Sequence, residues 1–124
     1  MNALLDTHAL LWWVTDDRRL SRRSRAIIAD GEIAVSVVSV WEIEIKRSLG
    51  RIEADTLAIM DEVSGTDGFR WLEVKPSHMA TLVTLPPLHG DPFDRMLVAQ
   101  AHRERVPLVT RDRALGAYPI ELKW

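Results

Sequence analysis

The sequence contains no cysteine, which excludes a disulfide framework, a thiolate metal site and a cysteine nucleophile. It also has no long apolar run. The apolar stretch over residues 1–14 is interrupted by Asp6, Thr7 and His8 and has no basic flank, so it predicts neither a signal peptide nor a membrane span. We therefore expect a cytoplasmic protein.

An excess of charge of one sign is also missing, because 16 basic residues nearly balance 18 acidic ones. The basic residues are mostly arginine, and they cluster at positions 18–25 and 103–113. Arginine side chains match the geometry of phosphate oxygens, so these clusters are candidate contacts for a polyanion. In the alternative interpretation they lie on solvated helix faces and pair with Asp16, Asp17 and Glu104.

Segments with strand character alternate with segments of helical periodicity along the chain. We predict strands over residues 3–5, 33–38, 71–74, 107–109 and 118–122. We predict helices over residues 21–29, 39–49, 55–63, 77–85 and 92–103. This alternation favours an α/β/α sandwich around a mostly parallel sheet, and the length of 124 residues suits a single domain over residues 1–124.

Four acidic residues stand where predicted strands end or predicted helices begin: Asp6, Glu42, Asp94 and Asp112. The carboxyl ends of parallel strands meet at one edge of a sheet, so we expect these side chains to converge there. Hard divalent cations prefer oxygen ligands, and Thr7 and Thr110 add hydroxyl groups beside the first and last acids. The pattern predicts a Mg²⁺ or Mn²⁺ site that activates water for attack on a phosphate group.

Each acid also has a purely structural interpretation. Ser39 and Glu42 are spaced as a capping box, and Glu42 is placed to pair with Lys46 one turn later. Asp91 is a good N-cap, and Asp94 would then complement the dipole of the helix that follows. The first and last of the four acids could cap short helical segments of their own. Only the convergence of all four would distinguish a site from a set of caps.

The residues around these acids resemble a known family. They are Leu4, Leu5, Asp6, Thr7 and His8; Ser39, Trp41, Glu42, Ile43 and Lys46; Leu88, His89, Asp91, Pro92, Phe93, Asp94, Arg95, Met96, Leu97, Ala99, Gln100 and Ala101; and Val109, Thr110 and Asp112. In this order, and over essentially the whole chain, they resemble the PIN domain. Within that family they are similar to the VapC-type ribonuclease toxins of bacterial toxin-antitoxin modules.

The resemblance implies an endoribonuclease that depends on Mg²⁺ or Mn²⁺ and leaves a 5′-phosphate and a 3′-hydroxyl. The family's acids match the four named above. Asp91 is a second candidate for the third acid, but we prefer Asp94 because it heads the helical pattern that accompanies that acid. The resemblance also implies a homodimer and a small antitoxin whose segment occupies the groove over the site. Among the arginines, Arg22, Arg23 and Arg111 are the expected RNA contacts.

Other protein classes fit the sequence less well. A phosphoaspartate phosphatase needs a second aspartate two positions after Asp6, where His8 stands, and a receiver domain needs an aspartate where the chain has Ser36 and Ser39. A metal-free ribonuclease that uses a pair of histidines remains an alternative, although the acids make no histidine necessary. A catalytically inactive PIN-like module that binds RNA or a partner protein is the other.

The sequence contains 5 tryptophans, and two of them, Trp12 and Trp13, are adjacent. Core packing is the default interpretation of tryptophan, but neighbouring residues cannot easily face inward from one side of a helix. We therefore expect one of the pair to lie at an interface or to stack on a base of RNA.

Overall fold

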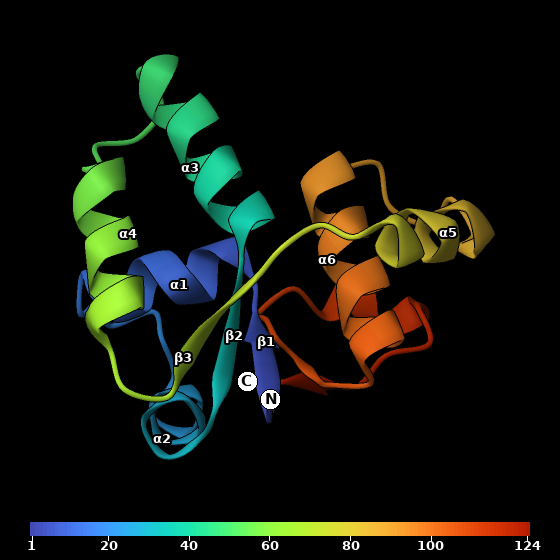
Figure 1. Cartoon of the computed structure of the whole chain (residues 1–124), viewed down its shortest axis with the longest axis horizontal. Helices are drawn as coiled ribbons and strands as arrows, with labels where there is room; N and C mark the ends of the chain where they lie inside the picture. The colour runs from blue at the N-terminus through green and yellow to red at the C-terminus, as the bar shows by residue number, and fades with distance from the viewer.

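A five-stranded, all-parallel sheet forms the centre of the molecule (Figure 1). The computed structural model describes all residues from Met1 to Trp124. The strands are β1 (Ala3–Leu5), β2 (Ile33–Ser36), β3 (Phe69–Leu72), β4 (Leu108–Val109) and β5 (Leu122–Lys123), in the spatial order β3-β2-β1-β4-β5. The chain therefore builds outward from β1 to β3 and then crosses to the other side of β1.

Helices lie on both sides of this sheet. They are α1 (Thr7–Val14), α2 (Arg22–Asp30), α3 (Val37–Ser48), α4 (Thr56–Gly65), α5 (Pro76–Thr84) and α6 (Pro92–Glu104), with a 3-10 helix, η1, over Arg113–Ala117. In Figure 1, α1 to α4 lie on one side of the strands, and α5 and α6 lie on the other. This arrangement confirms the predicted α/β fold with helices around a parallel sheet.

The sheet has a separate hydrophobic core on each face, because successive residues of a strand point to opposite sides. On β1, Ala3 and Leu5 join the core beneath α1 to α4, whereas Leu4 joins the core beneath α5 and α6. On β2, Ile33 and Val35 follow the first pattern and Ala34 the second. The two central strands are buried on both faces, which fixes the position of the residues that follow them.

Several predicted boundaries were wrong by a few residues. The predicted strand 33–38 ends at Ser36, because the Ser36 hydroxyl accepts a hydrogen bond from the Val38 N–H at 3.1 Å and starts α3 there. The strand predicted over residues 71–74 lies at Phe69–Leu72, and the one predicted over 118–122 lies at Leu122–Lys123. Helix α1 lies outside the predicted helices, and it begins directly after Asp6, whose side chain caps it. No helix of the protein is long and apolar enough to cross a membrane.

Candidate functional site

The four predicted acids all line one cavity of about 350 Å³ at the carboxyl edge of the sheet. Its lining residues are Asp6, Thr7, His8, Trp12, Glu42, Lys46, Asp91, Asp94, Arg111 and Asp112. Asp6 directly follows β1 and Asp112 follows β4, which pairs with β1 on the side where the strand order reverses. Ligands of open α/β sheets bind at such reversals, so the topology brings these acids to a place suited to a ligand.

Asp6 is a deeply buried ligand candidate at the end of β1. Its side chain is only 6% exposed, and its Oδ1 caps α1 by accepting a hydrogen bond from the Ala9 N–H at 2.8 Å. Burial raises the pKa of Asp6, while the Thr110 hydroxyl and the Ala9 N–H lower it. Thr110 therefore stabilises the charge of the Asp6 carboxylate in a dry environment.

Glu42 is held by two partners on neighbouring elements. It is buried on α3, where it accepts a hydrogen bond from the Thr7 hydroxyl at 2.6 Å and lies 2.7 Å from the Lys46 ammonium. The predicted capping box was wrong, because α3 begins at Val37 and Ser39 therefore lies inside the helix. The predicted pairing with Lys46 is confirmed. Thr7 and Lys46 together fix the Glu42 carboxylate beside the cavity.

Asp94 lies in the first turn of α6 and has a strongly perturbed carboxyl group. Burial raises its pKa to about 7, with further contributions from the negative charges of Asp91, Glu42 and Asp6, while His89 lowers it. Asp91 is the N-cap of α6, since its Oδ1 accepts hydrogen bonds from the N–H groups of Phe93 at 2.8 Å and Asp94 at 3.0 Å. The cap interpretation of Asp91 is confirmed, and its side chain also lines the cavity.

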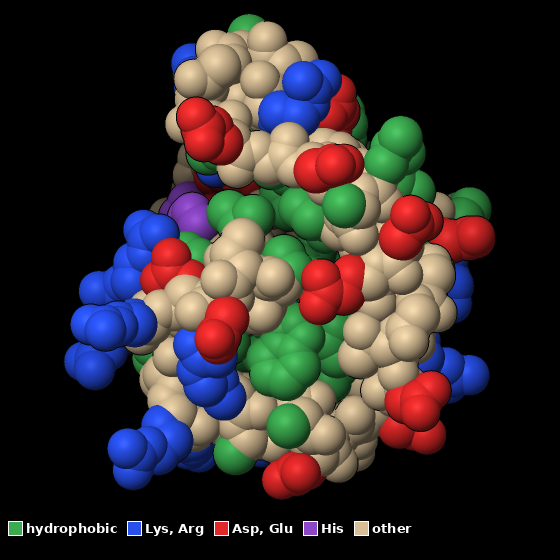
Figure 2. Space-filling model, turned by 90° about the vertical axis from the view of Figure 1, so that its left-hand side faces the viewer, with side chains coloured by type: hydrophobic (Ala, Val, Ile, Leu, Met, Phe, Trp, Pro, Cys, Tyr) green, Lys and Arg blue, Asp and Glu red, His purple; other side chains and the backbone are tan.

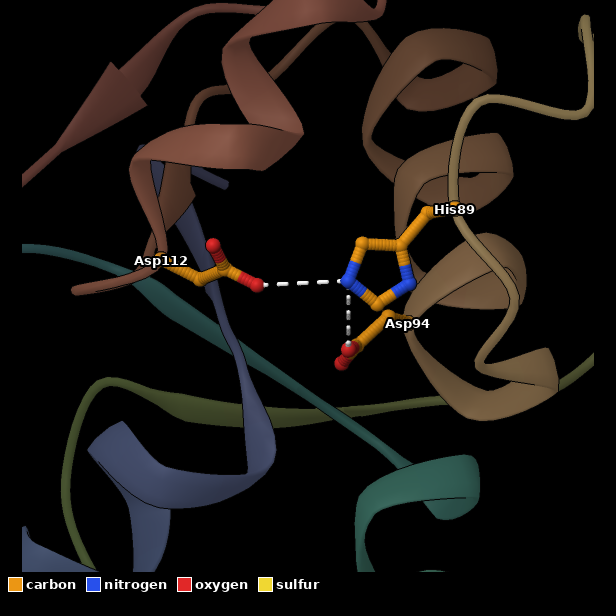
Figure 3. A group of neighbouring side chains, drawn as sticks. All are labelled: His89, Asp94 and Asp112. Carbon is orange, nitrogen blue, oxygen red and sulfur yellow. Dashed lines mark ion pairs between the residues drawn. The ribbon is translucent and has the colours of Figure 1, made fainter.

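His89 lies between two of the acids, a position that the sequence pattern did not predict. Figure 3 shows its ring between Asp94 and Asp112, with Nε2 at 3.4 Å from Asp112 Oδ2 and 3.8 Å from Asp94 Oδ2. The one sequence signal was the turn at residues 89–92, which places a histidine directly before the cap of α6.

The residues around the cavity fit a divalent cation. One potential ligand atom from each of His89, Asp94 and Asp112 lies within 4.8 Å of the others. Asp6 and Glu42 line the same cavity but lie outside that close group, each engaged by the partners described above. Crowded carboxylate oxygens are the donors that Mg²⁺ and Mn²⁺ prefer, and the raised pKa of Asp94 shows how poorly its charge is compensated without a cation.

Comparison with known proteins identifies the family. The model of the PIN domain family matches residues 3–120. The chain belongs to the PIN domain family. It is also 34% identical over 117 residues to Ribonuclease VapC22 from Mycobacterium tuberculosis, an alignment that covers 93% of this chain and 90% of that protein. The resemblance found in the sequence is thus confirmed: the chain is a PIN domain similar over nearly its whole length to a VapC ribonuclease.

Solved structures with similar folds support the architecture. VapBC2 from Rickettsia felis bound to a DNA fragment from its promoter matches with a TM-score of 0.73 and 14% identity, covering 99% of this chain and 98% of that one. DNA-bound VapBC from Salmonella typhimurium matches with a TM-score of 0.72 and 14% identity, covering 99% and 97%. At this identity the matches establish a shared PIN fold.

Two groups of arginines are candidates for contact with RNA: Arg111 beside the cavity, and Arg22 and Arg23 on helix α2. Arg111 lines the cavity, with its guanidinium 5.8 Å from the centre of the Trp12 ring. Figure 2 shows many Lys and Arg side chains gathered at the left edge of the face that it presents. Arg22 and Arg23 are exposed and make no ion pair, so their charges are available to a ligand.

The pairing interpretation of the basic cluster holds for other arginines. Arg19 pairs with Asp17 at 2.8 Å, and Arg25 pairs with Asp16 at 2.6 Å. Glu104, by contrast, pairs with His78 rather than with an arginine.

The adjacent tryptophans both pack against the core, and an interface or base-stacking role for one of them stays a prediction. Trp12 is buried, stacks on His8 and packs edge-on against Trp124, whereas Trp13 packs against Phe69 at the border of the same core. Both tryptophan side chains contact this core because it extends from α1 to Phe69 on β3. The core therefore covers two adjacent faces of α1. The strongly exposed tryptophan is instead Trp41, whose side chain is 62% exposed.

The raised pKa of Asp94 predicts how stability changes with pH in the absence of metal. The folded state holds this proton more tightly than the unfolded chain, so the stabilisation is complete below about pH 4 and is lost as the pH rises through about 7. In EDTA, we expect the free energy of unfolding to fall between about pH 4 and pH 7, and to fall less in Asp94→Asn. Urea unfolding measures both. Equal pH dependence in the two proteins would contradict the assignment of the raised pKa to Asp94. The control is Asp61→Asn, because Asp61 is an exposed residue of α4.

Proposed function

We propose that this PIN domain is an endoribonuclease that hydrolyses RNA with Mg²⁺ or Mn²⁺ held by Asp6, Glu42, Asp94 and Asp112. The observation that carries the proposal is the convergence of these four acids on one cavity where the strand order reverses. The charge of the cavity supports it, since phosphate would be repelled by this many carboxylates without a cation. RNA is an intracellular substrate, which agrees with the cytoplasmic location expected from the sequence.

A cation bound here would polarise the scissile phosphate and lower the pKa of the attacking water. Asp94 and Asp112 offer closely spaced carboxylate oxygens to hold it. Asp6 supplies a buried carboxylate from the end of β1, and Glu42 is oriented by Thr7 and Lys46. These fixed side chains would keep the reacting groups in place.

The elements beside Asp112 also fix its position. The Asp112 N–H donates a hydrogen bond to the Thr110 hydroxyl at 3.1 Å, and Asp112 Oδ1 accepts one from the Ala114 N–H at 3.0 Å. Arg111, between Thr110 and Asp112, supplies a cation at the border of the cavity, where its guanidinium can donate hydrogen bonds to phosphate oxygens. The loop after β4 would thus contribute both to cation binding and to RNA binding.

Cleavage of RNA tests the proposal directly. Purified protein, freed of copurifying partners, is incubated with total RNA in Mg²⁺ or Mn²⁺. We expect discrete cuts that EDTA abolishes and that Asp94→Asn weakens by at least about 10–100-fold, because removal of a ligand weakens cation binding. Asp61→Asn should cut normally. A folded wild-type protein that binds RNA without cutting any of it would favour the alternative of an inactive module that binds RNA or a partner.

The exposed arginines predict how RNA binding depends on salt. Replacing Arg22 and Arg23 by Ala should weaken binding and reduce the slope of log K against log salt by about 0.7 for each phosphate that is no longer bound. Fluorescence anisotropy with a labelled single-stranded RNA, in the weakly cleaving Asp94→Asn background, measures the slope. The matched control replaces Arg103 and Arg105, which lie at the end of α6 opposite Asp94. Equal effects of the two double substitutions on the slope would contradict the assignment of Arg22 and Arg23 as RNA contacts.

We further propose two protein partners: a small antitoxin that covers the acidic cavity, and a second copy of this chain. The copy would occupy a groove of about 540 Å³ between α3, α5 and α6, lined by Val37, Val38, Trp41, Val74, Met79, Leu82, Pro92, Phe93 and Met96. Trp41 is 62% exposed there and packs edge-on against Phe93. A large exposed apolar patch of this kind is typical of a protein interface.

The oligomeric state of two variants tests the homodimer. We expect Trp41→Glu to place a charge in the groove and make the protein monomeric at concentrations where the wild type is dimeric. Val83→Glu is the control, because Val83 is 84% exposed on α5 but does not line the groove. Light scattering after size exclusion measures the mass. A dimer in Trp41→Glu, or a monomer in the wild type, would rule out this interface.

A further inference from the structure

His89 is held in place by hydrogen bonds to its backbone and to its ring in the turn that precedes α6. Its backbone N–H donates a hydrogen bond to the hydroxyl of Tyr118, a residue only 2% exposed, at 2.9 Å. Its Nδ1 accepts a hydrogen bond from the Asp91 N–H at 3.2 Å. The residue that caps α6 with its side chain therefore also orients the His89 ring with its backbone.

The hydrogen bond to Nδ1 determines where the ring carries its hydrogen. A ring nitrogen that accepts a hydrogen bond carries no hydrogen of its own. In the neutral ring, the hydrogen therefore resides on Nε2. In the charged ring Nε2 carries a hydrogen as well. Nε2 is therefore an N–H donor in either state. In the neutral ring, the hydrogen bond from the Asp91 N–H favours the tautomer with the hydrogen on Nε2.

This tautomer conflicts with a metal-binding role for the ring. Nε2 lies near oxygens of Asp94 and Asp112, and the three atoms could surround a cation (Figure 3). A histidine ligand, however, binds metal through a bare nitrogen and usually donates its other ring N–H to an acceptor. Here the other ring nitrogen faces a donor instead of an acceptor. The surroundings of the ring are thus the opposite of those around a typical histidine ligand.

We infer that His89 is a positioning residue, whose Nε2–H is directed at the carboxylates of Asp94 and Asp112 from outside the ligand set of the cation. The inference rests on the proposed function, because it assumes that these acids hold a cation. The distances of 3.4 and 3.8 Å are longer than closed hydrogen bonds, so the contact is an electrostatic one across a small gap. The cation then has oxygen ligands only, which suits Mg²⁺.

The position of His89 between the two acids lets it orient both carboxylates. Asp94 comes from α6 and Asp112 from the loop after β4, and no hydrogen bond joins the two side chains. His89 is the group that spans them. Partners that orient metal-binding carboxylates typically contribute about 10–100-fold to metal affinity, so its removal should be measurable without any assay of RNA cleavage.

The ring nitrogens can be observed by NMR of ¹⁵N-labelled protein near pH 8, with His89→Gln used to assign the signals. We expect the chemical shift of a hydrogen-bearing Nε2 in the metal-free protein, and the same tautomer after saturation with Mg²⁺. A hydrogen on Nδ1 in the metal-free protein, or a switch of the hydrogen to Nδ1 when Mg²⁺ is added, would overturn the inference. The second result would identify His89 as a ligand.

Metal affinity then tests the positioning role. Calorimetry with Mn²⁺ should show about 10–100-fold weaker binding to His89→Leu, and His89→Gln should recover most of it because its amide keeps an N–H donor at similar reach. His102→Leu, at the far end of α6, should bind like the wild type. Undiminished binding by His89→Leu, or binding by His89→Gln as weak as that of His89→Leu, would overturn the inference alone. Failure of the wild type to bind Mn²⁺ would overturn the proposed function with it.

Discussion

The crowding of carboxylates at one edge of the sheet is the constraint on which the rest of the structure depends. Like charges repel, and burial makes the repulsion stronger because the interior screens charge poorly. The fold compensates part of this cost locally: Ala9 and Thr110 donate toward Asp6, while Thr7 and Lys46 stabilise Glu42. At Asp94, burial together with the charges of Asp91, Glu42 and Asp6 raises the pKa to about 7, although His89 lowers it. The two hydrophobic cores must therefore hold together a site that would otherwise push its own elements apart.

The structural roles of these acids are compatible with the proposed binding of a cation, because a carboxylate has two oxygens. Asp112 shows this most clearly: Oδ1 caps η1 by accepting from the Ala114 N–H, while Oδ2 faces His89 across the cavity. Asp6 likewise caps α1 with Oδ1, which accepts a hydrogen bond from the Ala9 N–H. Capping fixes the orientation of the carboxylate, and the other oxygen is then available to a ligand. A cap at the carboxyl end of a buried parallel strand is thus a suitable place for a metal ligand.

The sequence predicted the class of fold because hydrophobic periodicity and local caps act over short distances. The caps at Ser21, Asp55 and Asp91 are all at or next to the predicted helix starts. The second strand was predicted too long because Val37 and Val38 favour strands, yet the Ser36 cap and the packing of Val38 in the second core place them in a helix. The acids were found because they follow or begin predicted elements. His89 was missed because its position depends on Tyr118, which lies 29 residues further along the chain.

The proposed function would make cation binding and RNA binding at the acidic cavity dependent on one another. Without a cation, a phosphate that entered would meet the carboxylates lining the cavity, with Lys46 and Arg111 as the nearby cationic side chains. Lys46 is already paired with Glu42, which leaves Arg111 as the side chain free to attract RNA at the cavity itself. A bound divalent cation would oppose the negative field of the carboxylates, so RNA and cation must each raise the affinity for the other by the same factor. Arginines outside the cavity can therefore hold RNA in the absence of metal, but the scissile phosphate should enter together with the cation.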